Sequence, residues 1–397
     1  MINFYYYTLF FKLVIFFELI TYLLSIIRLT KVFNTTLITR FFIVIPALIT
    51  IFILVYYLKK IRFDFLSFVL VLLVFYGLNM SLFHWQFTES IHYEVYYVVS
   101  EISMILFAFF VYTFTFNIDF SNKKNKEYLE KLLDKVSFYI LLINTITISF
   151  GYIINEFSCY HVYMSLSGKF LLIPFAWAFI KNYKFYVLFT MFLLVLGGKF
   201  GVLVAALFMS IFIYKFKKNI STVLLSLIGI FTIIIFLLVF YLIKDYNGIA
   251  IIEKINGNYN VFNLDPEKLI LFAGGRFIEI FSVFDHFTLS DYLFGKGIGY
   301  EYLDILSGKT FIHNVHITPF GLVSKFGLFM TFLLYGTIIV YLFKGSSNCM
   351  KDDLFIFFKS ILIGMLVFSL TEYAFFVNLI IWVALGYISN RSKQCAE

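Results

Sequence analysis

A short polar stretch late in the chain collects an arginine, three closely spaced glycines, two histidines and several carboxylates. The arginine is Arg276, which follows two glycines and opens an amphipathic stretch that ends near residue 287. Its guanidinium offers a planar fork of donors that suits phosphate oxygens. Glu279 lies one helical turn further on, so an ion pair within one helix and a phosphate site both fit this spacing.

The two histidines, His313 and His316, stand three residues apart. A zinc site would need a third ligand, and this pair lacks the glutamate of the metalloprotease pattern. We therefore expect no metal here. An imidazole changes its charge near neutral pH, so one histidine suits acid–base chemistry or contact with a phosphate. A capping or packing role for the other is the alternative.

The glycines Gly295, Gly297 and Gly299 form a run in which backbone N–H groups could cradle a phosphate. The run does not match the dinucleotide-binding pattern, which needs different glycine spacing between a strand and a helix. The simpler interpretation is a turn whose glycines let the backbone approach another element closely. Lys199 lies between two apolar stretches, where a lysine must face a polar cavity, bind an anion such as pyrophosphate, or extend to the membrane surface.

The composition requires that these groups be held by a membrane protein. The chain of 397 residues is 62% hydrophobic and only 14% charged, against roughly 25% charged in soluble domains. Several apolar runs approach the ~20 residues that cross a bilayer as a helix, and their pattern is continuous instead of alternating as in a β-barrel. The net charge of +8 indicates no nucleic-acid partner, because basic residues gather at the cytoplasmic ends of membrane helices.

The sequence predicts an all-α polytopic integral membrane protein with about twelve transmembrane helices. One long periplasmic loop, residues 244–317, separates nine helices in residues 1–243 from three in residues 318–397. The predicted spans are 4–27, 41–58, 64–83, 92–116, 136–156, 165–180, 184–197, 200–215, 220–243, 318–343, 354–371 and 373–390.

Basic residues predict the orientation of these helices. With both termini in the cytoplasm, most lysines and arginines of the connecting segments share one side, and residues 244–317 lie outside. The connection 28–40 is an exception, because it carries basic residues on the opposite side. The basic residues that share the predicted cytoplasmic side are Lys59, Lys60, Arg62, Lys123, Lys124, Lys126, Lys131, Lys135, Lys181, Lys184, Lys215, Lys217, Lys218, Lys344, Lys351, Arg391 and Lys393.

Taken in order, these motifs resemble the O-antigen polymerase (Wzy) and O-antigen ligase superfamily. The resemblance rests on the glycine-flanked Lys199, the late external loop, the Gly-Gly-Arg ending at Arg276, the glycine run and a histidine placed before a span. In that superfamily a glycine lies eleven residues after the histidine. That count from His316 reaches Gly327, whereas from His313 it reaches Ser324. His316 is therefore matched to the family histidine, with His313 as the rival.

The resemblance implies glycosyl transfer at the periplasmic face of the bacterial inner membrane, without a cofactor or metal. The substrate would be an undecaprenyl-pyrophosphate-linked oligosaccharide, and a chain-length regulator and a flippase would be partners alongside membrane lipid. Lys199, Arg276 and the three glycines would hold the pyrophosphate, and His316 or His313 would act with Arg276 in catalysis. The resemblance leaves the possible acid or base open among three carboxylates, which are Glu279, Asp285 and Asp291.

Two other functions share parts of this pattern. An O-antigen ligase, which moves finished glycan onto lipid A core, would use the same kind of site. A flippase for lipid-linked sugar is the non-enzyme alternative, but transporters tend to show internal repeats and charges near the bilayer midplane. We found no internal repeat in this chain, so we favour the polymerase.

Overall fold

The computed structural model describes residues 12, 61–87, 92–93, 95–157, 168–196, 200–218, 276–303, 311–312, 315, 317–345, 349–371, 375–376 and 378–394. Within these ranges the chain is a bundle of helices, and nine of them coincide with predicted spans. Their bounds are α3 Phe65–Phe87, α4 Val95–Phe116, α5 Lys123–Phe157, α6 Gly168–Lys181, α7 Lys184–Leu196, α8 Phe200–Lys218, α14 Thr318–Phe343, α15 Asp353–Ser369 and α16 Leu379–Gln394. The predicted spans 4–27, 41–58 and 220–243 lie outside the described residues.

Four of these helices are long and apolar enough to cross a membrane, namely Phe65–Trp85, Tyr97–Phe116, Lys123–Ser149 and Thr318–Phe343. Each reaches or exceeds the ~20 residues that a bilayer requires. The side chains that these helices expose include large apolar ones such as Phe75 and Phe329, which would be unfavourable in water. These features indicate a membrane-embedded helical protein.

Two helix boundaries differ from the prediction. Helix α5 begins at Lys123, thirteen residues before the predicted start, because the charged segment ahead of the apolar run continues the same helix. The last span was predicted from residue 373, yet α16 begins at Leu379. Phe375 and Phe376 instead occupy a turn in which both rings pack against Trp382. Burial of these rings in a turn overrides the helical continuation that hydropathy suggests.

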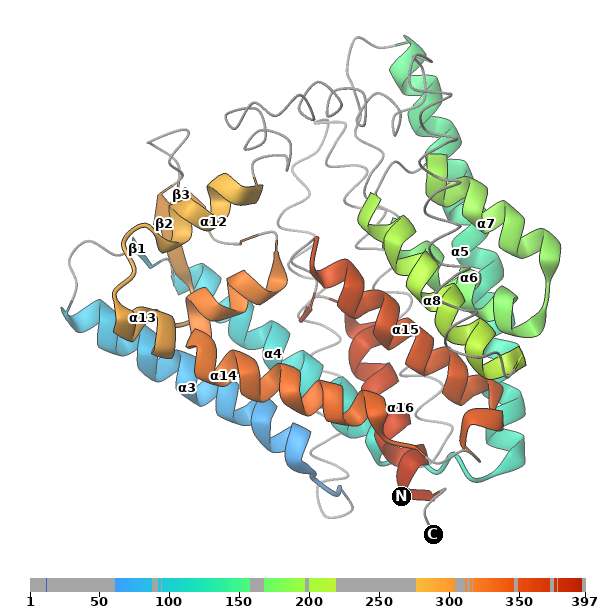
Figure 1. Ribbon diagram of the computed structural model, residues 1–397, viewed down its shortest axis with the longest axis horizontal. Helices are drawn as coiled ribbons and strands as arrows, with labels where there is room; N and C mark the ends of the chain where they lie inside the picture. The colour runs from blue at the N-terminus through green and yellow to red at the C-terminus, as the bar shows by residue number, and fades with distance from the viewer. Residues whose placement is uncertain are drawn as a thin grey trace.

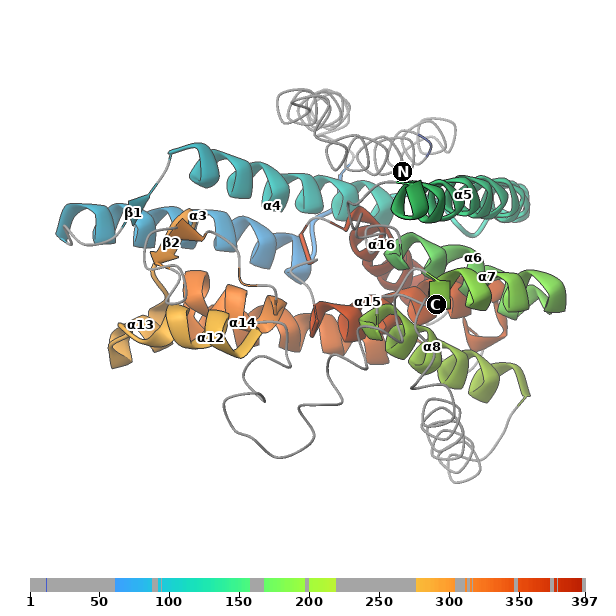
Figure 2. The same ribbon diagram turned by 90° about the horizontal axis from the view of Figure 1, so that it is seen from above.

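The helices fall into two groups joined by the C-terminal helices. In Figures 1 and 2, α5–α8 lie on one side, α3, α4 and α14 extend to the other, and α15 and α16 lie between them. Close packing of α8 with α15, of α4 with α16 and of α3 with α14 connects the groups. One continuous apolar core runs through both, and its largest buried side chains include Trp177, Trp382 and Tyr112.

At one end of the bundle, basic side chains from distant segments meet shared carboxylates, and we call this the basic end. Lys126 donates to Asp352 over 2.6 Å, and Arg391 lies 3.4 Å from the same carboxylate. Lys181 contacts Glu130 at 2.7 Å and Asp353 at 3.2 Å, and Lys217 also pairs with Asp353. Five of the segments that were predicted to share a side therefore lie together, because Asp352 and Asp353 directly follow Lys351.

The opposite end, which we call the loop end, carries the described part of the predicted external loop. Two short helices lie there, α12 (Arg276–Phe284) and α13 (Leu289–Phe294). A three-stranded antiparallel sheet of order β1-β2-β3 joins β1 (His92–Tyr93), β2 (Tyr300–Leu303) and β3 (Phe311–Ile312). The described residues are mostly helical, in agreement with the all-α prediction. The small sheet gives backbone groups of two connecting segments the hydrogen-bond partners they need.

Candidate functional site

Residues Gly295–Gly299 form a buried segment, which we call the strap, between the loop-end portions of three helices. Its backbone N–H groups all donate within the protein. Lys296 and Gly297 donate to the carbonyls of Ser324 and Lys325 in α14, at 2.9 and 2.8 Å. Ile298 donates to Gly77 in α3 at 3.4 Å. The Ser81 hydroxyl, also in α3, donates to the Ile298 carbonyl at 2.7 Å.

The three glycines of the strap adopt positive φ angles of 77°, 94° and 79°. A Cβ on Gly295 would lie 2.5 Å from the Gly327 nitrogen, and a Cβ on Gly297 would lie 2.3 Å from the Ser81 nitrogen. Gly327 is itself at φ 71° and makes a kink within α14. The interpretation of the run as a close-packing turn is thus confirmed. Its N–H groups already have acceptors, so the strap offers no phosphate cradle in this structure.

Lys296 of the strap belongs to a buried group of ionisable side chains, which we call the outer polar cluster. Its other members are His84 and Asp291. Asp291 caps α13, where its carboxylate accepts hydrogen bonds of 2.9 Å from the backbone and the hydroxyl of Thr288. The His84 Nε2 lies 3.8 Å from one carboxylate oxygen, and the Lys296 Nζ lies 4.0 Å from the other. One fixed carboxylate thus stands between a histidine and a lysine, within the range of charge–charge interaction with both.

Aromatic rings enclose the lysine of this cluster. The Lys296 Nζ lies 4.7 Å from the centre of the Phe287 ring and 5.2 Å from that of Tyr300. Burial, followed by the Asp291 charge, raises the pKa of the Tyr300 phenol, so the Tyr300 hydroxyl stays neutral near pH 7.

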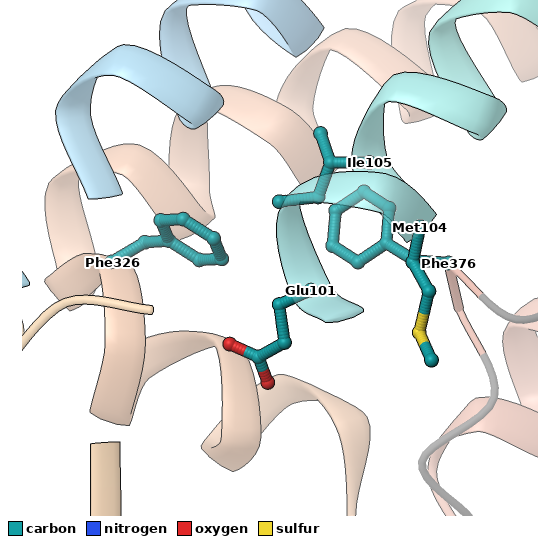
Figure 3. A pocket seen from close by; sticks show the side chains of 5 residues that line it. All are labelled: Glu101, Met104, Ile105, Phe326 and Phe376. Carbon is teal, nitrogen blue, oxygen red and sulfur yellow. The ribbon is translucent and has the colours of Figure 1, made fainter. Parts of the chain in front are cut away.

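A second ionic contact, the inner ion pair, lies among the membrane helices below the strap. Lys325 of α14 pairs with Glu101 of α4, and their side chains are only 1% and 7% exposed. The other Glu101 oxygen accepts the Gly299 N–H at 2.9 Å. Glu101 also lines a small cavity of ≈ 10 Å³ with Met104, Ile105, Phe326 and Phe376 (Figure 3). This volume is far below the hundreds of cubic ångströms that a sugar or lipid site needs, so we assign the pair to structure.

The structure brings together the elements that carry three predicted site residues. Arg276 is the first residue of α12, which contacts both β2 and α14. His313 directly follows β3, and His316 precedes α14 by two residues; both histidines lie outside the described residues. Lys199 also lies outside them, just before α8. Near the start of that helix, a Cβ on Gly201 would lie 2.1 Å from the Thr371 hydroxyl, beyond the end of α15.

The three candidate carboxylates have different surroundings. The Asp285 side chain is 60% exposed, and it lies 3.7 Å from His286, whose side chain is 86% exposed. Glu279 lies half-buried in the first turn of α12. Only Asp291 of these three is buried and lies close to both a lysine and a histidine. The structure therefore favours Asp291 as the carboxylate with a defined role.

The motif search missed His84, Glu101, Lys296 and Lys325. Each is an ionisable residue within or beside an apolar helix, where a charge is expensive and usually has a partner. That signal was visible in the sequence, although the partners were not. Among the described residues, no three His, Cys, Asp or Glu side chains are placed to hold a metal ion.

The fold and these contacts define the class of protein: a membrane-embedded helical bundle with a buried polar site at one end. No protein-family model, curated protein or solved structure matches the chain.

Proposed function

We propose that this protein is an O-antigen polymerase that transfers a growing glycan from undecaprenyl pyrophosphate onto a lipid-linked repeat unit at the periplasmic face of the inner membrane. The observation that carries the proposal is the gathering of α12, β3 and α14 at the loop end, opposite the basic end. Helix α12 begins with Arg276, β3 ends just before His313, and α14 begins two residues after His316. An external site would have to lie on the side away from the basic connections.

The reaction breaks the bond between the anomeric carbon of the donor sugar and its pyrophosphate, and it forms a new bond to an acceptor hydroxyl. The departing pyrophosphate gains negative charge, so cations aimed at it stabilise the transition state. Arg276 and Lys199 supply such charge in this proposal. His316, or its rival His313, takes the proton that the acceptor hydroxyl loses.

The closed hydrogen bonding of the strap changes the roles of the loop-end residues in this proposal. The glycines position the site instead of binding pyrophosphate, because their N–H groups donate to helix carbonyls and to Glu101. Asp291 supports the site through its contacts with Lys296 and His84. The base is therefore a histidine, with Asp291 as a positioning residue.

Deletion of the gene, followed by gel analysis of the surface glycan, tests this function. The strain should be complemented with the wild type and separately with Arg276→Ala, His316→Ala and His313→Ala. We expect the deletion to leave lipid A core bearing a single repeat unit, and the Arg276→Ala protein to fail to restore the ladder. Full polymer length with Arg276→Ala would remove the arginine from the mechanism.

The same gel separates the alternatives. Core without any repeat unit, together with accumulated lipid-linked polymer, would identify a ligase instead. Single repeat units that remain on the carrier inside the cell would identify a flippase. Reporter fusions at residue 260 should place that residue outside the cytoplasm. Fusions that place it in the cytoplasm would put the proposed site on the wrong side of the membrane.

A further inference from the structure

The strap and α13 lie alongside the membrane helices instead of beyond their ends. Ile298 hydrogen-bonds the carbonyl of Gly77, which is eight residues from Trp85 at the end of the α3 span. At 1.5 Å per residue this is a depth of about 12 Å. Gly297 bonds the carbonyl of Lys325 in α14, two residues before the kink at Gly327. The depth measured along α3 is more than a third of the ~30 Å hydrocarbon layer.

Figures 1 and 2 agree with this depth, since both views show α13 beside the terminal part of α3. A hydrogen bond of 2.7 Å from the Tyr76 hydroxyl, in the middle of α3, reaches the carbonyl of Phe294 at the last residue of α13. This bond satisfies a carbonyl that the end of a helix leaves without an internal partner. Helix α13 therefore ends at the depth of Tyr76.

The exposure pattern of α13 is inverted relative to a helix in water. Its acidic residue, Asp291, is buried at 7% exposure. Its large apolar residues face outward instead, with Leu289 77%, Leu293 42% and Phe294 49% exposed. Helices α3 and α14, which α13 contacts, also expose large apolar side chains within their spans, among them Phe75 and Phe329. Hydrocarbon is the surrounding in which all these side chains are stable.

Irregular backbone is tolerated at membrane depth only where it is buried in protein with its polar groups paired. The five residues of the strap are buried, each N–H group has an acceptor, and the Ile298 carbonyl accepts from Ser81. The two charged side chains that enter with it, those of Asp291 and Lys296, lie 4.0 Å apart. The segment thus has the properties that burial in a membrane demands.

We propose that Leu289–Gly299 is a re-entrant segment that enters the membrane from the loop end and returns. Its outward face, formed by Leu289, Leu293 and Phe294, contacts the acyl chains of phospholipids in that leaflet. The outer polar cluster accordingly lies below the membrane surface, on the protein side of the segment. This re-entrant segment does not depend on the reaction proposed above, so the two proposals can be tested separately.

Photo-crosslinking in native membranes tests this contact. The full-length chain carrying Phe294→p-benzoylphenylalanine, a substitution of one half-exposed aromatic group by another, is irradiated in membranes whose phospholipid is radiolabelled. We expect a radioactive protein–lipid adduct severalfold more intense than that from Asp285→p-benzoylphenylalanine. Asp285 is the control because it is at least as exposed but lies in the polar turn after α12. Mass spectrometry of the adduct should place the new bond on an acyl chain.

Three results would overturn the proposal. Equal labelling at the two positions, or bonds only to headgroup or glycerol atoms, would place α13 on the membrane surface. Crosslinks from position 294 to a second copy, or to another segment of the same chain, would show that protein covers this face. Leu293→p-benzoylphenylalanine serves as the second variant, and an absence of lipid adduct at both 293 and 294 would equally exclude contact with acyl chains.

Discussion

Asp285 and Asp291 are six residues apart, yet one lies at the surface and the other in the outer polar cluster. Asp291 accepts two hydrogen bonds from Thr288 and lies near His84 and Lys296, whereas Asp285 is mostly exposed. A carboxylate with fixed donors and a nearby ammonium group is costly to neutralise, because its partners stay buried. The two aspartates therefore form a matched pair for mutation.

Asp291→Asn should destabilise the protein by about 1.5–3 kcal/mol, the usual value of hydrogen bonds to a charged group. Asp285→Asn should change stability by less than about 0.5 kcal/mol, as expected for an exposed site. Thermal unfolding in detergent, followed by circular dichroism, measures both. Equal effects of the two substitutions would show that the contacts of Asp291 contribute nothing.

At the scale of elements, the strap joins α3, α4 and α14 through backbone contacts that only glycine permits. Its positive φ angles and its close approaches to Ser81 and Gly327 leave no room for a Cβ. The kink of α14 at Gly327 faces Gly295, so the irregular points of two elements fit together. The geometry of each element is therefore determined partly by the other.

Gly297→Ala should cost at least about 1–3 kcal/mol from backbone strain alone, and more from the clash with Ser81. Gly336→Ala is the control, because nothing lies within 4 Å of the added Cβ in the same chain. That substitution, within α14, should be neutral or stabilise by up to about 1 kcal/mol. Denaturation midpoints of the purified variants provide the comparison, and a stable Gly297→Ala protein would argue against the observed strap.

At the scale of the whole molecule, the inner ion pair connects residues 224 positions apart. Glu101 also holds Gly299, so this single carboxylate joins α4, α14 and the strap. The opposite end has its own network around Asp352 and Asp353. The apolar core between the two ends is thus bounded by charged contacts that resist sliding of the helices.

Breaking the inner ion pair on one side should be more damaging than removing it altogether. Glu101→Gln or Lys325→Met alone leaves a buried charge, and each should cost about 3–5 kcal/mol. The double variant Glu101→Gln/Lys325→Met should recover part of that loss, because neither charge remains. Folded yield and thermal stability in detergent measure the difference, and simple additivity of the two losses would contradict direct pairing.

The sequence by itself determined the helical class and most helix positions, because bilayer crossing requires long apolar runs that are visible locally. The predicted span 318–343 coincides with α14. The glycine run adopts the close-packing turn that was its simpler interpretation, whereas the resemblance had implied pyrophosphate binding. Hydropathy did not reveal the small sheet or the turn at Phe375 and Phe376, since pairing and burial against distant residues decide both.

Only the tertiary structure decided which ionisable groups meet. His84 and Asp291 come from elements about two hundred residues apart, as do Glu101 and Lys325. A local pattern shows that a charge in an apolar helix needs a partner, but the packing of the helices selects that partner. Depth is decided in the same way: the strap is polar and glycine-rich in sequence, and its hydrogen bonds to α3 and α14 carry it below their ends.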